Sequence, residues 1–274
     1  MHGLTGIDHV LVGVDDLEVA REGWSRLGFT LSPRGRHIGW GTANYCVMFP
    51  GDYVELLGVL DASQFTNNLD RFLEGGEGLL GVALSCDDAA KTAAALQEDG
   101  IGAEAPKDLR RILESDGEEQ FQLVHLPPAA TPGISSFVVS HLTPEIVWRP
   151  EWLSHSNGAQ RIASVTYAVD DPTRLLPAYA ALFGEDAVAA ENLSLTVTTG
   201  GARLHFLAPE AAEDLAKLPP RGAPCGLSMA VEVESLDQPR RALEENGVAY
   251  QELDADSLQV APEDANGIVV EFRV

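Results

Sequence analysis

A segment that occurs twice is the feature that most constrains the fold of this chain. Residues 7–16 read IDHVLVGVDD and residues 162–171 read IASVTYAVDD, so half of the positions are identical. A second pair consists of LQEDGI from Leu96 and LEENGV from Leu243. A short repeated unit cannot bury its own sheet face and must pack against a neighbouring copy. The sequence therefore predicts a fold assembled from paired copies of one small unit.

The first copy reads as a strand, a helix and three further strands. Residues 7–14 are rich in β-branched and apolar side chains, which is typical of a strand. Asp15 and Asp16 then supply side chains that cap a helix, apolar residues recur at helical spacing over residues 17–27, and Gly28 ends the helix. Three short strand-like segments follow, near residues 29–31, 45–49 and 53–59.

The same order recurs along the rest of the chain. Further units begin at Leu79, Ile162 and Gly226, each with a strand followed by a helix and more strands. This order predicts an α+β fold of four βαβββ units in two paired halves. The predicted domains are an N-terminal half of units one and two, residues 1–145, a connection, residues 146–160, and a C-terminal half of units three and four, residues 161–274.

The charge of the chain restricts the partners that we expect. There are 18 basic and 42 acidic residues, which gives a formal net charge of −24. Such a surface repels phosphate backbones and anionic lipid headgroups. We therefore expect no nucleic-acid partner and no membrane partner.

The cysteines and the N-terminal residues predict a reducing, cytoplasmic location. Cys46, Cys86 and Cys225 are widely spaced and form no CxxC pair, so neither a disulfide framework nor a cysteine zinc site is expected. The first residues show no basic and apolar pattern of a secretory signal. No uninterrupted apolar run is long enough to span a bilayer.

Several segments resemble glyoxalase-like domain proteins of the vicinal oxygen chelate superfamily, which includes glyoxalases, bleomycin resistance proteins and extradiol dioxygenases. They are IDHV at residues 7–10, GRHIGWGTAN at residues 35–44, YVELL at residues 53–57 and NGIVVE at residues 266–271. The resemblance covers essentially the whole chain. It implies the fold and leaves the reaction open, because this superfamily hosts isomerases, dioxygenases, epimerases, thiol transferases and metal-free binding proteins.

The resemblance implies a metal site between paired units. In this superfamily the sheets of two units curl into a half-open barrel around a divalent ion, and the first and last strands of each unit supply its ligands. These ligands are typically a histidine and a glutamate, and two neighbouring oxygens of the substrate complete the coordination. We therefore expect a divalent ion such as zinc, iron, manganese or nickel, and a small-molecule substrate.

Three residues are candidate metal ligands in the N-terminal half. His9 and Glu55 occupy the two ligand positions of unit one, and alternation places His9 on one strand face with Ile7 and Leu11. His141, at the end of the last strand of unit two, would complete a set of two histidines and one carboxylate. The alternative is a buried structural pair of His9 and Glu55, with His141 capping the end of its strand.

The other ligand positions carry poorer donors. Gly81 falls at the first-strand position of unit two, and Ser164 and Ser228 fall at the matching places of units three and four. His205 lies opposite Glu55 by offset, and Glu271 occupies the last place. We therefore expect a C-terminal half that is structural, that holds a metal-free pocket, or that mediates formation of a homodimer.

Polar residues around the glycine-rich segment are candidate substrate contacts. Arg36, His37 and Asn44 lie within GRHIGWGTAN, where backbone amides and a cation could meet an anionic substrate. The alternative is that the glycines serve turns that need positive φ. His155, in an HSNG segment near two tryptophans, is interpreted as part of an Asn-Gly turn that packs the two halves together.

These residues predict a metal-dependent enzyme that acts on a small oxygenated or carbonyl-containing metabolite. The metal would polarise neighbouring substrate oxygens, and Glu55 would be either a ligand or a base. Isomerase, lyase and dioxygenase chemistry all fit this description. The alternative is a metal-free protein that binds or sequesters a small molecule, which Gly81, Ser164 and Ser228 favour.

Overall fold

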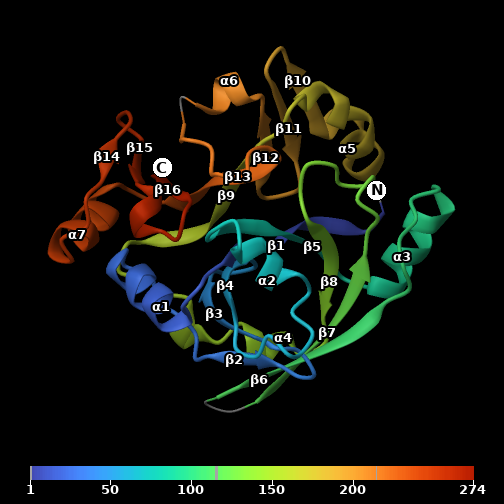
Figure 1. The fold of residues 1–274 in the computed structure, drawn as a ribbon, viewed down its shortest axis with the longest axis horizontal. Helices are drawn as coiled ribbons and strands as arrows, with labels where there is room; N and C mark the ends of the chain where they lie inside the picture. The colour runs from blue at the N-terminus through green and yellow to red at the C-terminus, as the bar shows by residue number, and fades with distance from the viewer. Residues whose placement is uncertain (1, 115–116, 214) are drawn as a thin grey trace.

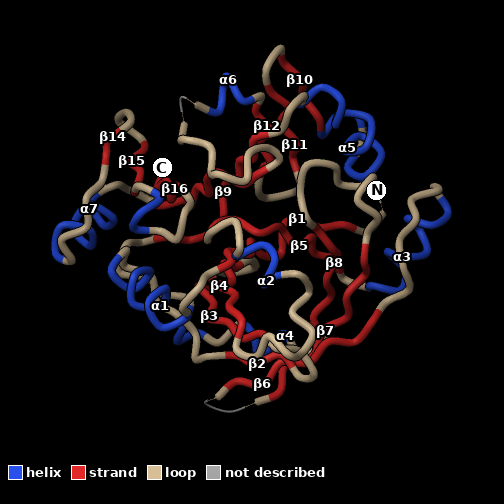
Figure 2. Tube along the Cα trace, in the orientation of Figure 1, coloured by secondary structure: helices blue, strands red, loops and turns tan. Residues whose placement is uncertain are grey.

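Two eight-stranded sheets form the framework of the protein (Figure 1). The computed structural model describes residues 2–114, 117–213 and 215–274. Strands β1 to β8 form the first sheet and strands β9 to β16 form the second. The chain therefore has the general α+β fold that the repeats predict, with most helices outside the sheets (Figure 2).

The first sheet is a closed barrel. Its order around the barrel is β1 (Leu4–Gly13), β4 (Tyr53–Val59), β3 (Thr42–Met48), β2 (Gly35–His37), β6 (Lys107–Leu113), β7 (Glu118–His125), β8 (Ser136–His141) and β5 (Gly78–Cys86). Antiparallel pairing of β2 with β6 joins the two units, with His37 opposite Arg111. The expectation of a half-open barrel is therefore wrong for this half, because this pairing seals the side opposite β1 and β5.

The second sheet is open. Its order is β10 (Val188–Glu191), β11 (Ser194–Thr198), β12 (Arg203–Leu207), β9 (Ala159–Ala168), β13 (Cys225–Val233), β16 (Val269–Arg273), β15 (Ser257–Val260) and β14 (Gln251–Glu252). Strands β10 and β14 lie at its two edges and do not pair with each other within the described residues. The two halves therefore share an architecture but differ in closure.

Most helices cover the outer faces of the sheets, but Leu69 and Val147, each from a short helix, pack against side chains of the barrel interior. The helices are α1 (Leu17–Arg26), α2 (Leu69–Leu73), α3 (Ala89–Glu98), α4 (Pro144–Val147), α5 (Leu176–Phe183), α6 (Pro209–Ala212) and α7 (Asp237–Glu245). The 3-10 turns are η1 (Pro150–Trp152), η2 (Pro172–Leu175), η3 (Glu185–Ala187) and η4 (Pro262–Asp264). Among the described residues, no helix has the length and apolar character needed to cross a membrane.

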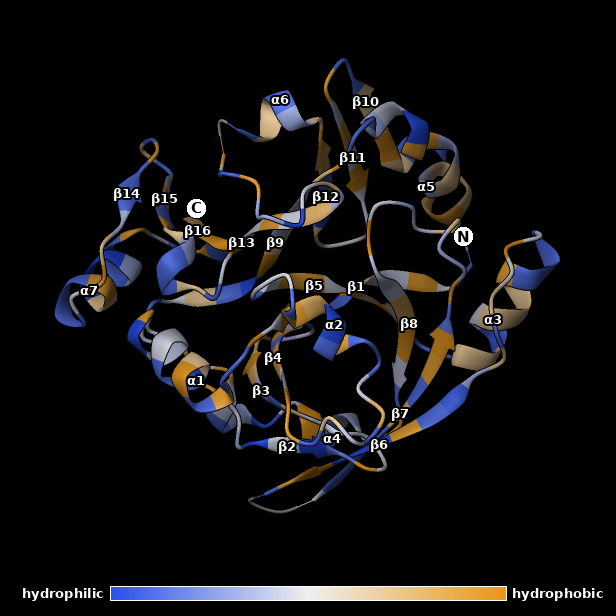
Figure 3. Cartoon of the chain, in the orientation of Figure 1, coloured by the Kyte–Doolittle hydropathy of each residue, from blue (hydrophilic) through white to orange (hydrophobic). Residues whose placement is uncertain are grey.

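One hydrophobic core joins the two sheets. Val10 and Val82 of the barrel belong to the same buried cluster as Val165 and Val231 of the second sheet. Hydrophobic residues run along barrel strands such as β3, whereas the outer helix α7 is mainly hydrophilic (Figure 3). The barrel wall is thus held from behind by a large apolar layer, which fixes the positions of its inward side chains.

The HSNG segment packs the connection against the first unit. The His155 ring accepts a hydrogen bond from the Thr30 backbone N–H at Nδ1 (3.0 Å), so Nε2 carries the proton and donates to the Met48 carbonyl (3.0 Å). Asn157 donates from Nδ2 to the Leu27 carbonyl at the end of α1. The structure supports the turn interpretation of this segment.

A β-bulge in β1 determines which side chains enter the barrel. Ile7 lies opposite Leu84 of β5, and its side chain joins the outer core. His9, two positions further on, lies opposite the adjacent Ala83, so Asp8 is an extra residue in the ladder. Simple alternation, which placed Ile7 and His9 on one face, is therefore wrong at this point, because the bulge shifts the phase of the strand.

The second sheet contains the same bulge without the carboxylate. Ile162 lies opposite Val231 of β13, and Ser164 lies opposite Ala230, which leaves Ala163 as the extra residue. The matching registers identify Ser164 as the structural counterpart of the barrel's first-strand histidine.

Gly41 illustrates how closely the segment after β4 packs on the barrel. A Cβ at Gly41 would lie 2.0 Å from the backbone oxygen of Asp61. We expect Gly41→Ala to lower the free energy of unfolding by about 1–3 kcal/mol, because backbone atoms must move. Gly102→Ala is the control, since its Cβ would meet only Pro127 at 3.8 Å. Equal urea unfolding midpoints for the two variants would contradict this packing.

Candidate functional site

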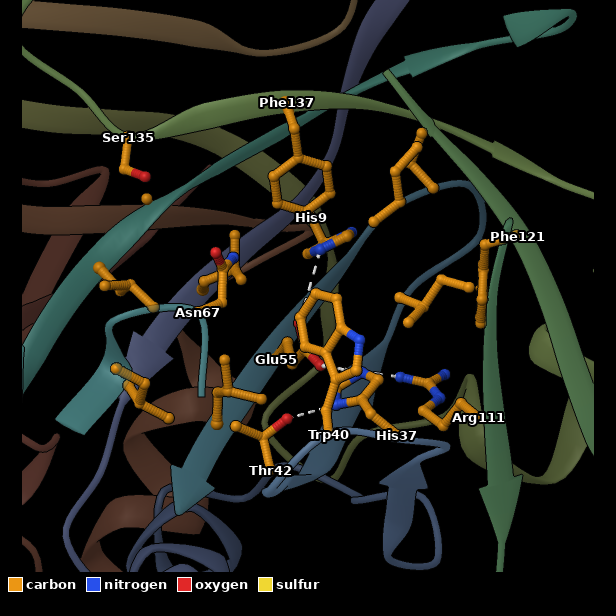
Figure 4. A pocket seen from close by; sticks show the side chains of 18 of the residues that line it. His9, His37, Trp40, Thr42, Glu55, Asn67, Arg111, Phe121, Ser135 and Phe137 are labelled. Carbon is orange, nitrogen blue, oxygen red and sulfur yellow. Dashed lines mark hydrogen bonds and ion pairs between the residues drawn. The ribbon is translucent and has the colours of Figure 1, made fainter. Parts of the chain in front are cut away.

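A cavity of about 90 Å³ lies inside the barrel (Figure 4). Polar side chains that line it are His9, His37, Thr42, Tyr53, Glu55, Thr66, Asn67, Arg111, His125 and Ser135. Apolar side chains that line it include Leu109, Phe121, Leu123, Phe137 and Val139. A mostly apolar cavity with a few convergent polar groups is the usual form of a small-molecule site.

The Glu55 carboxylate is the centre of the polar wall. Its side chain is buried, and Oε1 accepts a hydrogen bond from Asn44 Nδ2. Oε2 lies 3.5 Å from His9 Nε2, and Oε1 lies 3.7 Å from His37 Nε2 and 3.9 Å from Arg111 Nη1. Burial alone would raise the pKa of Glu55, but His9, His37, Arg111 and the Asn44 hydrogen bond together lower it. Glu55 is therefore an ionised base in a closed space at neutral pH.

Asp8 orients His9 toward Glu55. Burial opposes its charge, but the pKa of Asp8 falls to about 2 because His141 and His9 face it, so it is ionised and only accepts hydrogen bonds. His9 Nδ1 donates to Asp8 Oδ1 (2.7 Å), which leaves Nε2 facing Glu55. The His9 ring also stacks on Tyr53, with centroids 4.4 Å apart. Both contacts hold the imidazole in one orientation.

His141 is not directed at the same point as His9 and Glu55. Its Nε2 donates to Asp8 Oδ2 (2.8 Å), so Asp8 lies between the two histidines. In the parallel pairing of β1 with β4, Glu55 lies opposite Leu11, two residues after His9. In the parallel pairing of β5 with β8, Phe137 lies opposite Ala83, two residues after Gly81. The counterpart of Glu55 in unit two is thus Phe137, four residues before His141, and the three-residue ligand set that we expected is not assembled.

The GRHIGWGTAN segment contributes His37, Trp40 and Thr42 to the cavity wall. His37 lines the cavity, and its Nδ1 lies 2.9 Å from Thr42 Oγ1. Burial lowers the pKa of His37 to about 4, so the ring is neutral at pH 7. Arg36, one position earlier in β2, is exposed and lines a separate outer groove. Asn44 is buried behind Glu55 and acts on the cavity through that carboxylate.

The glycines of this segment serve close packing more than turns. Of Gly35, Gly39 and Gly41, only Gly39 has a positive φ, of 80°. A Cβ at Gly35 would lie 2.3 Å from Asn44 Oδ1, so only glycine leaves room for the side chain that holds Glu55. The turn interpretation therefore applies to Gly39, and a packing requirement explains Gly35.

Arg111 and Glu119 form a buried ion pair that the sequence did not reveal. Their exposed fractions are 3% and 1%, and Arg111 Nε donates to Glu119 Oε2. Arg111 Nη1 also donates to Cys46 Sγ (3.3 Å), and the guanidinium lies over the Phe121 ring at 5.4 Å. Arg111 and Glu119 both lie among other charged residues, in KDLRRIL of β6 and EEQFQLVH of β7, so the sequence does not distinguish them from an exposed hairpin. The one available signal for Asp8 was its place beside His9 in an apolar strand.

The residues present do not complete a protein-made metal site. Of the four strand positions that the superfamily pattern uses in this half, two hold His9 and Glu55 and two hold Gly81 and Phe137. Within the described part of the chain, no cluster of three or more His, Cys, Asp or Glu side chains is arranged to hold an ion. Catalytic sites commonly use three protein ligands, so this donor set is one short.

The counterpart positions in the second sheet follow the predicted offsets. His205 lies opposite Thr166, and Glu271 lies opposite Ala230. His205 Nδ1 is 3.0 Å from Thr196 Oγ1, and burial lowers the pKa of His205. Ser164, at the place of His9, offers only a hydroxyl.

Sequence comparison supports the resemblance. The family model described as glyoxalase-like domain matches residues 7–183, which is more than half of the chain. The chain belongs to the glyoxalase-like domain family. It is thereby a member of the vicinal oxygen chelate superfamily. A comparison of this glyoxalase-like protein with curated proteins finds no match.

Solved structures share the fold at low identity. A hypothetical protein from Staphylococcus aureus is 14% identical, with a TM-score of 0.69 and coverage of 97% of this chain and 98% of that chain. A mutant of 4-hydroxymandelate synthase from Streptomyces coelicolor is 14% identical, with a TM-score of 0.61 and coverage of 98% and 92%. A xylose isomerase-like TIM barrel/4-hydroxyphenylpyruvate dioxygenase fusion protein is 14% identical, with a TM-score of 0.59 and coverage of 98% and 49%.

The buried ion pair makes a prediction about stability. We expect Glu119→Ala to lower the free energy of unfolding by about 3 kcal/mol, because it leaves the Arg111 guanidinium buried without its carboxylate. Glu118→Ala, in the same strand, removes an exposed partner of Arg110 at 3.4 Å and should cost less than about 1 kcal/mol. Chemical denaturation measures both, and similar losses would contradict the difference in burial.

Proposed function

We propose that this glyoxalase-like protein is an enzyme that moves a proton on a small oxygenated or carbonyl-containing metabolite inside the barrel. The site would belong to the first two of four βαβββ units, residues 1–145, with residues 146–160 as the connection and residues 161–274 as a supporting half. The observation that carries the proposal is the ionised Glu55 carboxylate, buried against His9 in a cavity of about 90 Å³.

The chain's own side chains supply a base and its support. Glu55 would accept a proton from a carbon next to a carbonyl, because its carboxylate is ionised and lines the cavity. His9 Nε2, 3.5 Å from Glu55, would exchange that proton, with Asp8 stabilising the ring when it is charged. Neutral His37 and the Arg111 guanidinium face the place where negative charge would develop on a substrate oxygen.

Isomerase and lyase reactions both begin with this kind of proton removal, so they fit the site better than oxygen chemistry does.

One observation favours a metal-dependent form of the proposal. His9 donates its Nδ1 proton to a carboxylate, as metal-binding histidines usually do. His9 and Glu55 would then need a third donor beyond the described residues or from the substrate. Zinc, iron, manganese and nickel are the candidates, and metal analysis of untagged protein, with His9→Ala as control, tests this form.

A second candidate function is binding without turnover, which the apolar half of the cavity favours. Phe137 and Gly81 stand where ligands would be expected, and neither offers a reactive group. The C-terminal half would then support the binding barrel or pair with a second copy of the chain.

Hydrogen exchange with solvent tests for proton transfer without knowledge of the product. Small 2-hydroxy ketones are incubated with the protein in D₂O, and loss of the C–H signal next to the carbonyl is followed by NMR. We expect exchange above the buffer rate, and a fall of at least about 100-fold in Glu55→Gln. Glu271→Gln, at the last-strand position of the second sheet, is the matched control and should leave exchange unchanged. Bound compounds that exchange no faster than in buffer would favour the binding protein instead.

A further inference from the structure

The cavity has two chemically different walls. His9, Glu55 and His37 belong to the first unit, and the Nε2 atoms of both rings lie within 3.5–3.7 Å of the Glu55 oxygens. Phe137 contacts the other side of His9, with ring centroids 5.8 Å apart at an angle of 64°, so that His9 lies between Phe137 and Glu55 (Figure 4). A molecule beside His9 would therefore meet the Glu55 carboxylate at one end and the Phe137 ring at the other.

The two strand positions of unit two that match His9 and Glu55 carry no polar side chain, which contributes to this division. Gly81 is the counterpart of His9, and a Cβ there would lie 2.4 Å from the backbone oxygen of Ser135. Phe137 replaces the carboxylate of the last strand. The backbone leaves no space for a ligand side chain at Gly81, so the apolar wall is built into the strand packing.

The charges around the cavity disfavour a second anion. The carboxylates of Asp8, Glu55 and Glu119 are all buried in the barrel wall. Arg111 is the one permanent cation among the described residues that line the cavity, and it already pairs with Glu119. An anionic ligand would meet Glu55 with no further permanent cation to balance it, in a place where charges are poorly screened. The net charge of −24 opposes its approach as well.

The size of the cavity limits the ligand to a few atoms. A dry cavity of roughly 150 Å³ accommodates benzene, which has about six non-hydrogen atoms. A cavity of about 90 Å³ is smaller, so it suits a ligand of about six non-hydrogen atoms or fewer. This is the size of a compound with a chain of about three or four carbons.

We infer that the cavity selects uncharged short-chain compounds that carry oxygens at one end and hydrocarbon at the other, such as hydroxy ketones, and rejects carboxylates of the same size. The inference rests on the proposed function and specifies its substrate class. The Glu55 carboxylate repels anionic groups and so favours a ligand whose oxygenated end is uncharged. Phe137 determines the length of the hydrocarbon end that fits.

1-Hydroxy-2-butanone and lactate test the charge requirement because they have the same number of non-hydrogen atoms and both carry adjacent oxygens. We expect calorimetry to show that lactate binds roughly tenfold or more weakly than 1-hydroxy-2-butanone. Glu55→Gln should reduce this difference, because the repelling charge is gone. Equal affinities, or binding of neither compound, would overturn the inference. The exchange experiment decides the proposed function separately, because selective binding of the hydroxy ketone without exchange would support the inference and contradict the enzyme.

Phe137→Ala tests the length requirement. The parent chain should prefer 1-hydroxy-2-butanone over 1-hydroxy-2-hexanone, its homologue with two more carbons in the hydrocarbon end. The variant should shift this preference toward 1-hydroxy-2-hexanone by at least about tenfold, since one methylene in an apolar pocket contributes a factor of that order. Phe183→Ala is the matched control, because Phe183 is also partly buried but lies in α5, outside the cavity. An unchanged preference in a folded Phe137→Ala protein, shown by circular dichroism, would overturn the role of Phe137.

Discussion

An ionised carboxylate inside a closed barrel must be balanced by its neighbours, and Glu55 sets this requirement for the whole site. An isolated buried charge would shift its pKa and become neutral. Here Asn44 donates a hydrogen bond to Glu55, while His9, His37 and Arg111 lie within 3.5–3.9 Å of its oxygens. These partners come from β1, β2, β3 and β6, so the balance depends on strands from both units being joined into one barrel.

Two local features of the backbone make this arrangement possible. The bulge at Asp8 places two consecutive polar residues where they can face the barrel interior, so that Asp8 can hold both His9 and His141. The pairing of β2 with β6 brings Arg111 beside His37. The second sheet retains the bulge with Ala163 in place of the aspartate, and it lacks closure. The contrast explains why one half of a repeated fold carries the polar cavity and the other does not.

The sequence predicted the features that rest on local pattern and missed those that rest on distant pairing. His9 and Glu55 stood out because they are polar residues in apolar strands, and both line the same cavity in the structure. Arg111 could not be found in this way, because it is one of four charged residues in β6, and a strand of this composition is expected to be exposed until its partner strand is known. His141 was placed by strand position alone, and the register shows that Phe137 has the place that His141 was given.

The most direct test of this account is the titration of the Glu55 carboxyl group, followed by carbon-13 NMR. The neighbouring His9, His37 and Arg111 should keep the midpoint below the ordinary value of 4.5 despite burial. In Arg111→Met the midpoint should rise, because a positive charge that favours the ionised form is removed. A midpoint at or above 4.5 in the parent protein would contradict the central claim that this cavity is organised around a buried, ionised carboxylate.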